Sequence, residues 1–322
     1  MRVFTLLGCL LFLSGTIQGG ALPHSAPVIN EVLATQVALD RSGFSPGEID
    51  GRAGRNVQRA VAAFQQSHQL PATGQMDDRT WKELAMAGGD VPPLVEYAIT
   101  DADVAGPFTP DIPPKLPDQA TLDALNYRTP LEALAERFHS SPALLQKLNP
   151  GAMFQRAGER LMVPNVMTSS VEAPASSSKA APAPASDITV AVTKSTSALT
   201  IEDSSGRVLF HAPVTSGSTH DPLPIGTWKV NGVQRNPKFH YNPELFWDAT
   251  AGDRKATLQP GPNNPVGIVW IDLSKPHYGI HGTPEPSNIG HVESHGCVRL
   301  TNWDADRVAQ WVKPGTKVVF RQ

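Results

Sequence analysis

One cysteine stands in the segment HVESHGCVRL at residues 291–300, between a His-Gly pair and a Val-Arg pair. The other cysteine of the chain, Cys9, falls in an apolar N-terminal stretch that is typical of an export signal. Once that signal is removed, Cys297 is the only thiol and cannot form an internal disulfide. An odd cysteine in an oxidising compartment indicates an intermolecular bridge, an inert buried residue or a thiol kept for its reactivity. The neighbouring histidines favour a reactive thiol.

Two histidines are candidates for activating this thiol. At its ordinary pKa of about 8.5, only about 3% of a cysteine is thiolate at pH 7, so a nucleophilic cysteine needs a base within hydrogen-bond reach. His295 would point the same way as Cys297 in an extended segment, although Gly296 permits a sharp turn that breaks this alternation. His281 ends the strand-like run HYGIH, and a neighbouring strand end could bring it beside the thiol.

A metal site is the competing interpretation. His281, His291, Glu293, His295 and Cys297 offer enough nitrogen, oxygen and sulfur donors for zinc. The segment from residue 291 to 297 is flanked by glycines and has no helical pattern, so its four-residue His-His spacing does not place both rings on one face. The pattern therefore favours a thiol nucleophile, with no metal and no cofactor.

The segment that must position these residues is mainly β. Residues 187–321 contain β-rich runs separated by Gly, Pro, Asn and Asp. The predicted strands are Ile188–Val192, Ala198–Ile201, Val208–His211, Gly226–Val233, Val266–Ile271 and Thr316–Phe320. One helix is predicted over Thr301–Val312, with Thr301 and Asp304 as a variant of the capping box. An aromatic-rich loop with His240, Tyr241 and Trp247 is expected either to cover a substrate or simply to pack.

The region upstream is predicted to be helical and modular. Residues 28–87 show apolar residues at helical spacing on two segments joined by a turn, and Asp77 is placed to cap a third helix. Residues 88–124 are rich in Pro and Asp and are expected to be irregular. Residues 125–166 predict two short helices followed by a strand at Arg160–Pro164.

Composition and charge indicate a linker and a signal peptide, and they argue against one class of partner. A linker at 167–186, MTSSVEAPASSSKAAPAPAS, is too polar and too rich in small residues to bury a core. Residues 1–21 are predicted to be a signal peptide, with an apolar stretch too short to cross a bilayer, and no stable membrane span is expected after its cleavage. The net charge of -3 argues against nucleic acid as a partner.

The catalytic candidates lie in a recognisable pattern. The run HGTPEPSNIGHVESHGCVRLTNWDA closely resembles the signature of L,D-transpeptidase catalytic domains of the YkuD family, and the resemblance extends over 187–321. It implies a mainly β, sandwich-like fold with one C-terminal helix, with Cys297 as nucleophile and His281 as general base. The Gly282 carbonyl would orient the imidazole, and backbone N–H groups of His295, Gly296 and Cys297 would form an oxyanion hole.

Two further roles follow from the same resemblance. Ser294 would hold the catalytic loop. Arg299, on the same strand face as Cys297, would bind a carboxylate of the substrate or serve as a structural ion pair.

The upstream modules also resemble cell-wall domains. Residues 28–87 resemble a three-helix peptidoglycan-binding domain through GFSPGEIDG, FQQ and TG at residues 43–74. Residues 125–166 are similar to a LysM module, a small α/β unit that binds N-acetylglucosamine polymers, but the usual first strand is hard to find. Either module could also act as a spacer.

The resemblance implies a reaction on peptidoglycan. The thiolate would attack the third residue of a peptide stem, expel D-alanine, and pass the acyl group to an amine of a second stem to form a 3-to-3 cross-link. Water as acceptor would make a carboxypeptidase, and a lysine of an envelope lipoprotein is a third acceptor. A non-catalytic cell-wall-binding protein is the alternative from another class. We expect a chain secreted to the cell envelope, in the periplasm.

Overall fold

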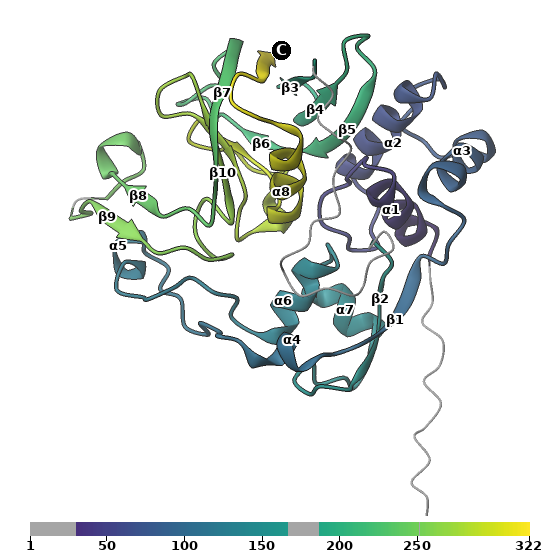
Figure 1. Cartoon of the computed structure of the whole chain (residues 1–322), viewed down its shortest axis with the longest axis horizontal. Coiled ribbons are helices and arrows are strands. Elements are labelled where there is room, and N and C mark those ends of the chain that lie inside the picture. Colours follow the sequence, from purple (N-terminus) through teal and green to yellow (C-terminus); the bar gives the residue numbers. More distant parts are fainter. Residues whose placement is uncertain (1–29, 167–186, 251) are drawn as a thin grey trace, which may run out of the picture.

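The structure is a computed structural model that describes residues 30–166, 187–250 and 252–322. The predicted signal peptide at 1–21 and the predicted linker at 167–186 therefore lie outside the described residues. Figure 1 shows a helical group in purple, a smaller mixed group in teal and a β-rich group in green and yellow. Among the helices that the structure describes, none is long and apolar enough to cross a bilayer.

The N-terminal group is a three-helix unit, as predicted. Asn30 and Asp77 cap the first and third helices by accepting hydrogen bonds from backbone N–H groups of the first turn. Phe64 and Leu84 are fully buried and hold the second and third helices together. The helices are α1 (Glu31–Arg41), α2 (Arg55–Ser67) and α3 (Asp78–Gly88).

The middle group is a small α/β unit that begins earlier than the predicted boundary at residue 125. Its two helices and last strand lie where the sequence predicts them, but its first strand is β1 (Leu94–Ala98), inside the stretch expected to be irregular. That expectation was wrong because β1 pairs antiparallel with a strand more than 60 residues later, which local sequence does not reveal. The other elements are α6 (Pro130–Arg137), α7 (Pro142–Leu148) and β2 (Arg160–Pro164).

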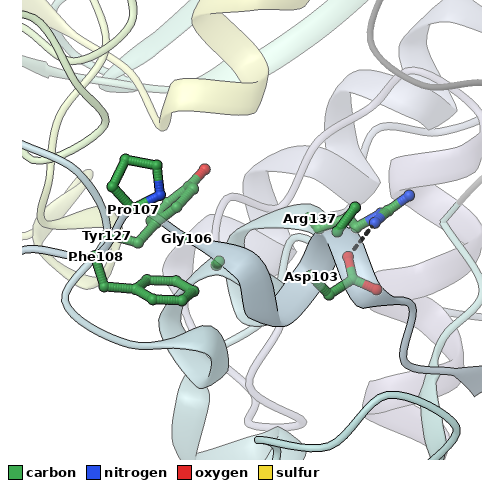
Figure 2. Close-up of a pocket in the computed structure, with 8 residues that line it drawn as sticks. Asp103, Gly106, Pro107, Phe108, Tyr127 and Arg137 are labelled. Atoms are coloured by element: carbon green, nitrogen blue, oxygen red, sulfur yellow. Dashed lines mark hydrogen bonds and ion pairs between the residues drawn. The ribbon is translucent and has the colours of Figure 1, made fainter.

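Two short helices between β1 and α6, namely α4 (Asp101–Ala105) and α5 (Leu116–Gln119), further correct the expectation of an irregular segment. The segment that begins with α4 borders a cavity of about 300 Å³, which is also lined by residues of α6. Figure 2 shows Pro107, Phe108 and Tyr127 on one side of the cavity and the Asp103–Arg137 ion pair on the other.

The C-terminal group is mainly β with one helix, as predicted. Within the described residues, nine of its strands form one mixed sheet, in the order β5-β4-β3-β13-β7-β10-β11-β12-β6, and β8 and β9 form a separate antiparallel pair. The long strand β7 is shared by two halves of this sheet: residues 226–229 pair with β13 and residues 230–235 with β10. The sheet therefore folds over on itself into a barrel-like unit around one apolar core.

The six predicted strands lie close to their expected positions as β3, β4, β5, β7, β10 and β13, and β11 lies in the strand-like run HYGIH, whereas β6, β8, β9 and β12 were not predicted. The strands of this group are β3 (Thr189–Thr193), β4 (Ala198–Glu202), β5 (Val208–Pro213), β6 (Thr215–Ser216), β7 (Gly226–Arg235), β8 (Phe239–Tyr241), β9 (Ala256–Leu258), β10 (Val269–Leu273), β11 (Gly279–His281), β12 (Val298–Arg299) and β13 (Lys317–Arg321). The strand predicted from Val266 starts three residues later, because Gly267 N–H closes a turn onto the Asn264 carbonyl at 2.8 Å.

Helix α8 (Asn302–Trp311) follows the catalytic segment and lies between the sheet and the two upstream groups (Figure 1). Its N-cap is Thr301, whose hydroxyl oxygen accepts a hydrogen bond from Asp304 N–H, as the capping pattern predicts. This cap starts α8 shortly after β12, the strand that follows Cys297.

A buried polar junction ties α8 to both upstream groups. Arg307 on α8 donates two hydrogen bonds to the carboxylate of Asp40 on α1, at 2.8 and 3.1 Å. His139, which follows α6, contacts the same carboxylate at 3.1 Å. Ser45 donates to Asp304 on α8 at 2.8 Å. Because all three groups meet at paired, buried side chains, the N-terminal units are docked onto the catalytic unit.

Candidate active site

The candidate nucleophile and base lie on neighbouring parallel strands. Strands β11 and β12 pair Ile280 with Val298 and His281 with Arg299. Ile280 and Val298 point into the apolar core and are almost completely buried. Side chains alternate along a strand, so His281, Cys297 and Arg299 share the opposite face. The parallel pairing thus places His281 on the strand next to the one that follows Cys297, although the two residues are sixteen positions apart in the sequence.

The environment of His281 selects one tautomer. Its Nδ1 lies 2.7 Å from the Gly282 carbonyl oxygen, which can only accept, so Nδ1 carries the proton and Nε2 is left as the basic nitrogen. The ring stacks on Trp270 of β10 at 5.4 Å between centroids. Burial, with the nearby Arg299 guanidinium, lowers the pKa of His281 to about 3. The imidazole is therefore neutral at physiological pH.

The thiol of Cys297 is also neutral in this resting arrangement. Burial raises its pKa, while a hydrogen bond from the Gly279 backbone and the charge of Arg299 partly oppose that shift. The hydrogen-bond partner of Sγ is the His277 carbonyl oxygen, at 3.7 Å. Since burial disfavours both charged forms, the pair rests as thiol and imidazole rather than as thiolate and imidazolium.

A tight turn holds the residues before the nucleophile. The buried hydroxyl of Ser294 donates to the Cys297 carbonyl and accepts from Gly217 N–H, both at 2.7 Å. Gly296 has φ 102°, and a Cβ there would lie 3.0 Å from the ring of Tyr278. Only glycine fits this turn without strain, so the conformation of the backbone before Cys297 depends on Gly296.

The side chain of His295 contacts the loop between β8 and β9. Its Nε2 lies 2.8 Å from Asp248, and its ring packs against Phe246 and Trp247. Arg299 Nη2 approaches Nδ1 of His295 at 3.5 Å. Nδ1 must accept from the guanidinium, so Nε2 donates to the carboxylate. With both ring nitrogens engaged, His295 is not available as the base in this structure, and the aromatic-rich loop lies next to the site.

Arg299 is the positive charge of the site. Its guanidinium is mostly buried; burial lowers its pKa, while Cys297, Glu285 and Asp248 raise it. Its contact with His295 uses only one of the five N–H donors of the guanidinium, so the group retains donors for a further acceptor.

The metal donors considered from the sequence are dispersed. Across 30–166, 187–250 and 252–322, no three His, Cys, Asp or Glu side chains come together in a way that could hold a metal ion. His281 and His295 each use ring nitrogens in contacts with protein groups instead.

Sequence reasoning missed the supporting aromatic and polar residues. Trp270 was detectable, because it alternates along β10 with the core residues Val269 and Ile271 and so faces the same side as His281. Tyr278 was assigned only to the end of a strand, although its ring lies against the turn at Gly296. Asp248 gave no signal, because it is brought to His295 only by the fold.

Comparison with known proteins identifies the two larger units. Residues 187–320 match the family model described as "L,D-transpeptidase catalytic domain", and residues 29–84 match the model described as "Putative peptidoglycan binding domain". The C-terminal unit is a YkuD-family L,D-transpeptidase domain. This transpeptidase domain contains both Cys297 and His281, and its bounds agree closely with the predicted 187–321.

Individual proteins are similar to parts of this chain. The chain is 28% identical to the "Putative L,D-transpeptidase YkuD" of Bacillus subtilis over 60% of its own length and 93% of that protein. It is 52% identical to the protein of that name from Bacillus licheniformis over 60 residues, which are 19% of this chain and 36% of the relative. The solved L,D-transpeptidase from Mycobacterium smegmatis is similar at 17% identity over 42% of this chain and 59% of that one, with a TM-score of 0.34.

Proposed function

We propose that this chain is a cysteine-dependent L,D-transpeptidase that forms 3-to-3 cross-links between peptidoglycan stems. The observation that supports this most directly is the parallel pairing of β11 and β12, in which His281 is opposite Arg299, two residues after Cys297. The family match of residues 187–320 and the adjoining match to a peptidoglycan-binding domain support peptidoglycan as the substrate.

In the proposed reaction, the Cys297 proton moves to Nε2 of His281 as Sγ attacks the carbonyl carbon of the third stem residue. The carbon–nitrogen bond to D-alanine breaks, the leaving amine takes the proton from the imidazolium, and a thioester remains. An acceptor amine then attacks the thioester and gives a proton to Nε2, and the thiolate leaves and regains it. The thioester conserves the energy of the broken amide.

The neutral forms of Cys297 and His281 bear on when the proton is transferred relative to the attack. Because burial disfavours thiolate and imidazolium alike, the proton transfer accompanies attack instead of preceding it. The oxyanion that forms would be stabilised by backbone N–H groups of His295, Gly296 and Cys297, in the turn that Ser294 holds. A carboxylate of the donor stem would pair with Arg299, whose donors are not fully used.

Three other assignments are part of the proposal. The units at 28–87 and 125–166 would contact glycan, the chain would act in the periplasmic part of the cell envelope, and the acceptor would be a second stem. Transfer to water or to a lipoprotein lysine uses the same thioester, so the nature of the product separates these outcomes.

The test is Cys297→Ser. The variant should fold like the parent but form no 3-to-3 product from defined tetrapeptide muropeptides, a loss of at least about a thousandfold, because a hydroxyl is a far weaker nucleophile beside this base. Mass spectrometry of the muropeptides measures the product. Undiminished cross-linking in the variant would reject the assignment, and D-alanine release without cross-links in the parent would indicate a carboxypeptidase.

A further inference from the structure

A buried carboxylate from the middle α/β unit reaches into the catalytic domain. Glu136 is on α6, and its two carboxylate oxygens each accept a hydrogen bond from Asn302 Nδ2, at 3.1 Å. Asn302 is the first residue of α8 and is completely buried. The Glu136 carboxylate also accepts a hydrogen bond at 2.8 Å from Tyr127, which borders the cavity in Figure 2. The Glu136 carboxylate is thus hydrogen-bonded to the C-terminal unit through Asn302 and to Tyr127, which precedes α6.

Asn302 in turn is wedged against the backbone that follows the catalytic histidine. Its Oδ1 accepts from Ile268 N–H at 3.2 Å, and its Nδ2 also donates to the Pro262 carbonyl at 3.1 Å. A Cβ on Gly282 would lie 2.2 Å from this Oδ1, and one on Gly267 only 1.9 Å. The amide of Asn302 therefore fills the space beside the two glycine backbones that a Cβ at either position would occupy.

The backbone at Gly282 sets the tautomer of His281. The Gly282 carbonyl accepts from Nδ1 of His281, which leaves Nε2 as the only basic nitrogen on the ring. A continuous series of contacts thus runs from Glu136 through the Asn302 amide to the Gly282 peptide and the catalytic imidazole.

We propose that Glu136 is a positioning residue for catalysis, supplied to the transpeptidase domain by the neighbouring unit, which fixes the amide of Asn302 and through it the Nδ1–H tautomer of His281. The middle unit is then part of the catalytic machinery as well as a module of the chain. The expected loss of turnover rests on the proposed function, whereas the expected change in the tautomer of His281 does not.

The first measurement observes the tautomer directly in the full chain. Nitrogen-15 chemical shifts of the histidine rings separate the two tautomers, and the spectrum of His281→Gln assigns the His281 signals. The parent should show a protonated Nδ1 and an unprotonated Nε2. Glu136→Met, which keeps the side-chain length but removes both acceptors, should move His281 toward a mixture of tautomers. Glu136→Gln, which keeps one acceptor oxygen, should restore the parent spectrum.

Glu132→Met is the matched control. It lies one turn earlier on α6 and accepts a hydrogen bond from Asn263 at 3.1 Å, so its loss disturbs the same contact region without touching Asn302. Its His281 spectrum should match the parent. If Glu136→Met does not fold, the pair Tyr127→Phe and Glu136→Met removes the buried hydroxyl that the single variant leaves unpaired and provides the same comparison.

The second measurement is turnover of tetrapeptide muropeptides. Glu136→Met should lower kcat about tenfold with KM within twofold, because it affects the base and not the substrate contacts; Glu136→Gln should recover most of the rate and Glu132→Met should keep it. An unchanged His281 spectrum in Glu136→Met, or an equal change in Glu132→Met, overturns the proposal. Absence of turnover in the parent would instead reject the proposed function, and the tautomer comparison would still decide this inference.

Discussion

Two polar regions of this protein favour different forms of their ionisable groups. The junction between the units favours the charged form of Asp40, whereas the active site favours the neutral forms of His281 and Cys297. At the junction between the units, Asp40 is paired with Arg307, which holds the pKa of Asp40 below its usual range despite complete burial. In the active site, the buried His281 and the half-buried Cys297 lie near a cation, and desolvation lowers the pKa of His281 and raises that of the Cys297 thiol. Paired charges are locked in place, whereas the neutral pair keeps a proton to exchange.

The largest effect on stability is expected when one charge at the junction is removed. Arg307→Met should lower the free energy of unfolding by about 3 kcal/mol or more, because it leaves Asp40 buried with only His139 as partner. Urea denaturation followed by circular dichroism measures the change. Arg321→Met, which breaks an exposed ion pair with Glu202, is the control and should cost less than about 1 kcal/mol. Equal effects would show that the junction does not depend on its charges.

The second test uses pH. Burial raises the pKa of Asp304 to about 6, so the folded chain holds a proton that the unfolded chain releases near pH 4. Stability should therefore fall as pH rises from about 4 to about 6, by on the order of 2 kcal/mol from this group. In Asp304→Asn this part of the pH dependence should disappear. An unchanged slope of unfolding free energy against pH would contradict the assignment.

The third test measures the protonation of the Cys297 thiol. Alkylation of Cys297 by iodoacetamide, followed at the level of the peptide, should titrate above the ordinary thiol pKa of about 8.5, because burial raises the pKa of this group. Arg299→Gln removes the charge that favours the thiolate and should slow alkylation at pH 7.5 by roughly threefold. A rate that is already constant through neutral pH would instead indicate a preformed thiolate and imidazolium.

The smallest effect is expected at the exposed edge of the site. Asp248→Asn weakens a contact between a half-exposed carboxylate and His295, so stability should change by less than about 1 kcal/mol. Turnover should fall about twofold to threefold, because the loop with Phe246 and Trp247 loses one anchor beside the thiol. A tenfold or larger loss of kcat would mean that this contact has a direct part in catalysis.

Local patterns were sufficient for most of the catalytic domain. The strands have apolar runs bounded by turn residues, and α8 carries its own cap at Thr301, so both kinds of element are readable from neighbours in the sequence. The short strands β6, β8, β9 and β12 were not predicted, and neither was β1, because Leu94–Ala98 is stabilised by pairing with β2, far along the chain. The same limit hid Asp248, Tyr278 and the Glu136–Asn302 contact.

The sequence by itself determined the reactive residue types and their order: a thiol after His-Gly, a second His-Gly pair upstream, and an arginine two positions beyond the thiol. The contacts of the two histidines could not be read from the sequence and depend on the fold. His281 keeps a basic nitrogen because a peptide carbonyl takes its other one, whereas His295 has both nitrogens engaged by Asp248 and Arg299. Tautomer and pKa depend on atoms brought near through the fold, and these neighbours come from distant parts of the chain.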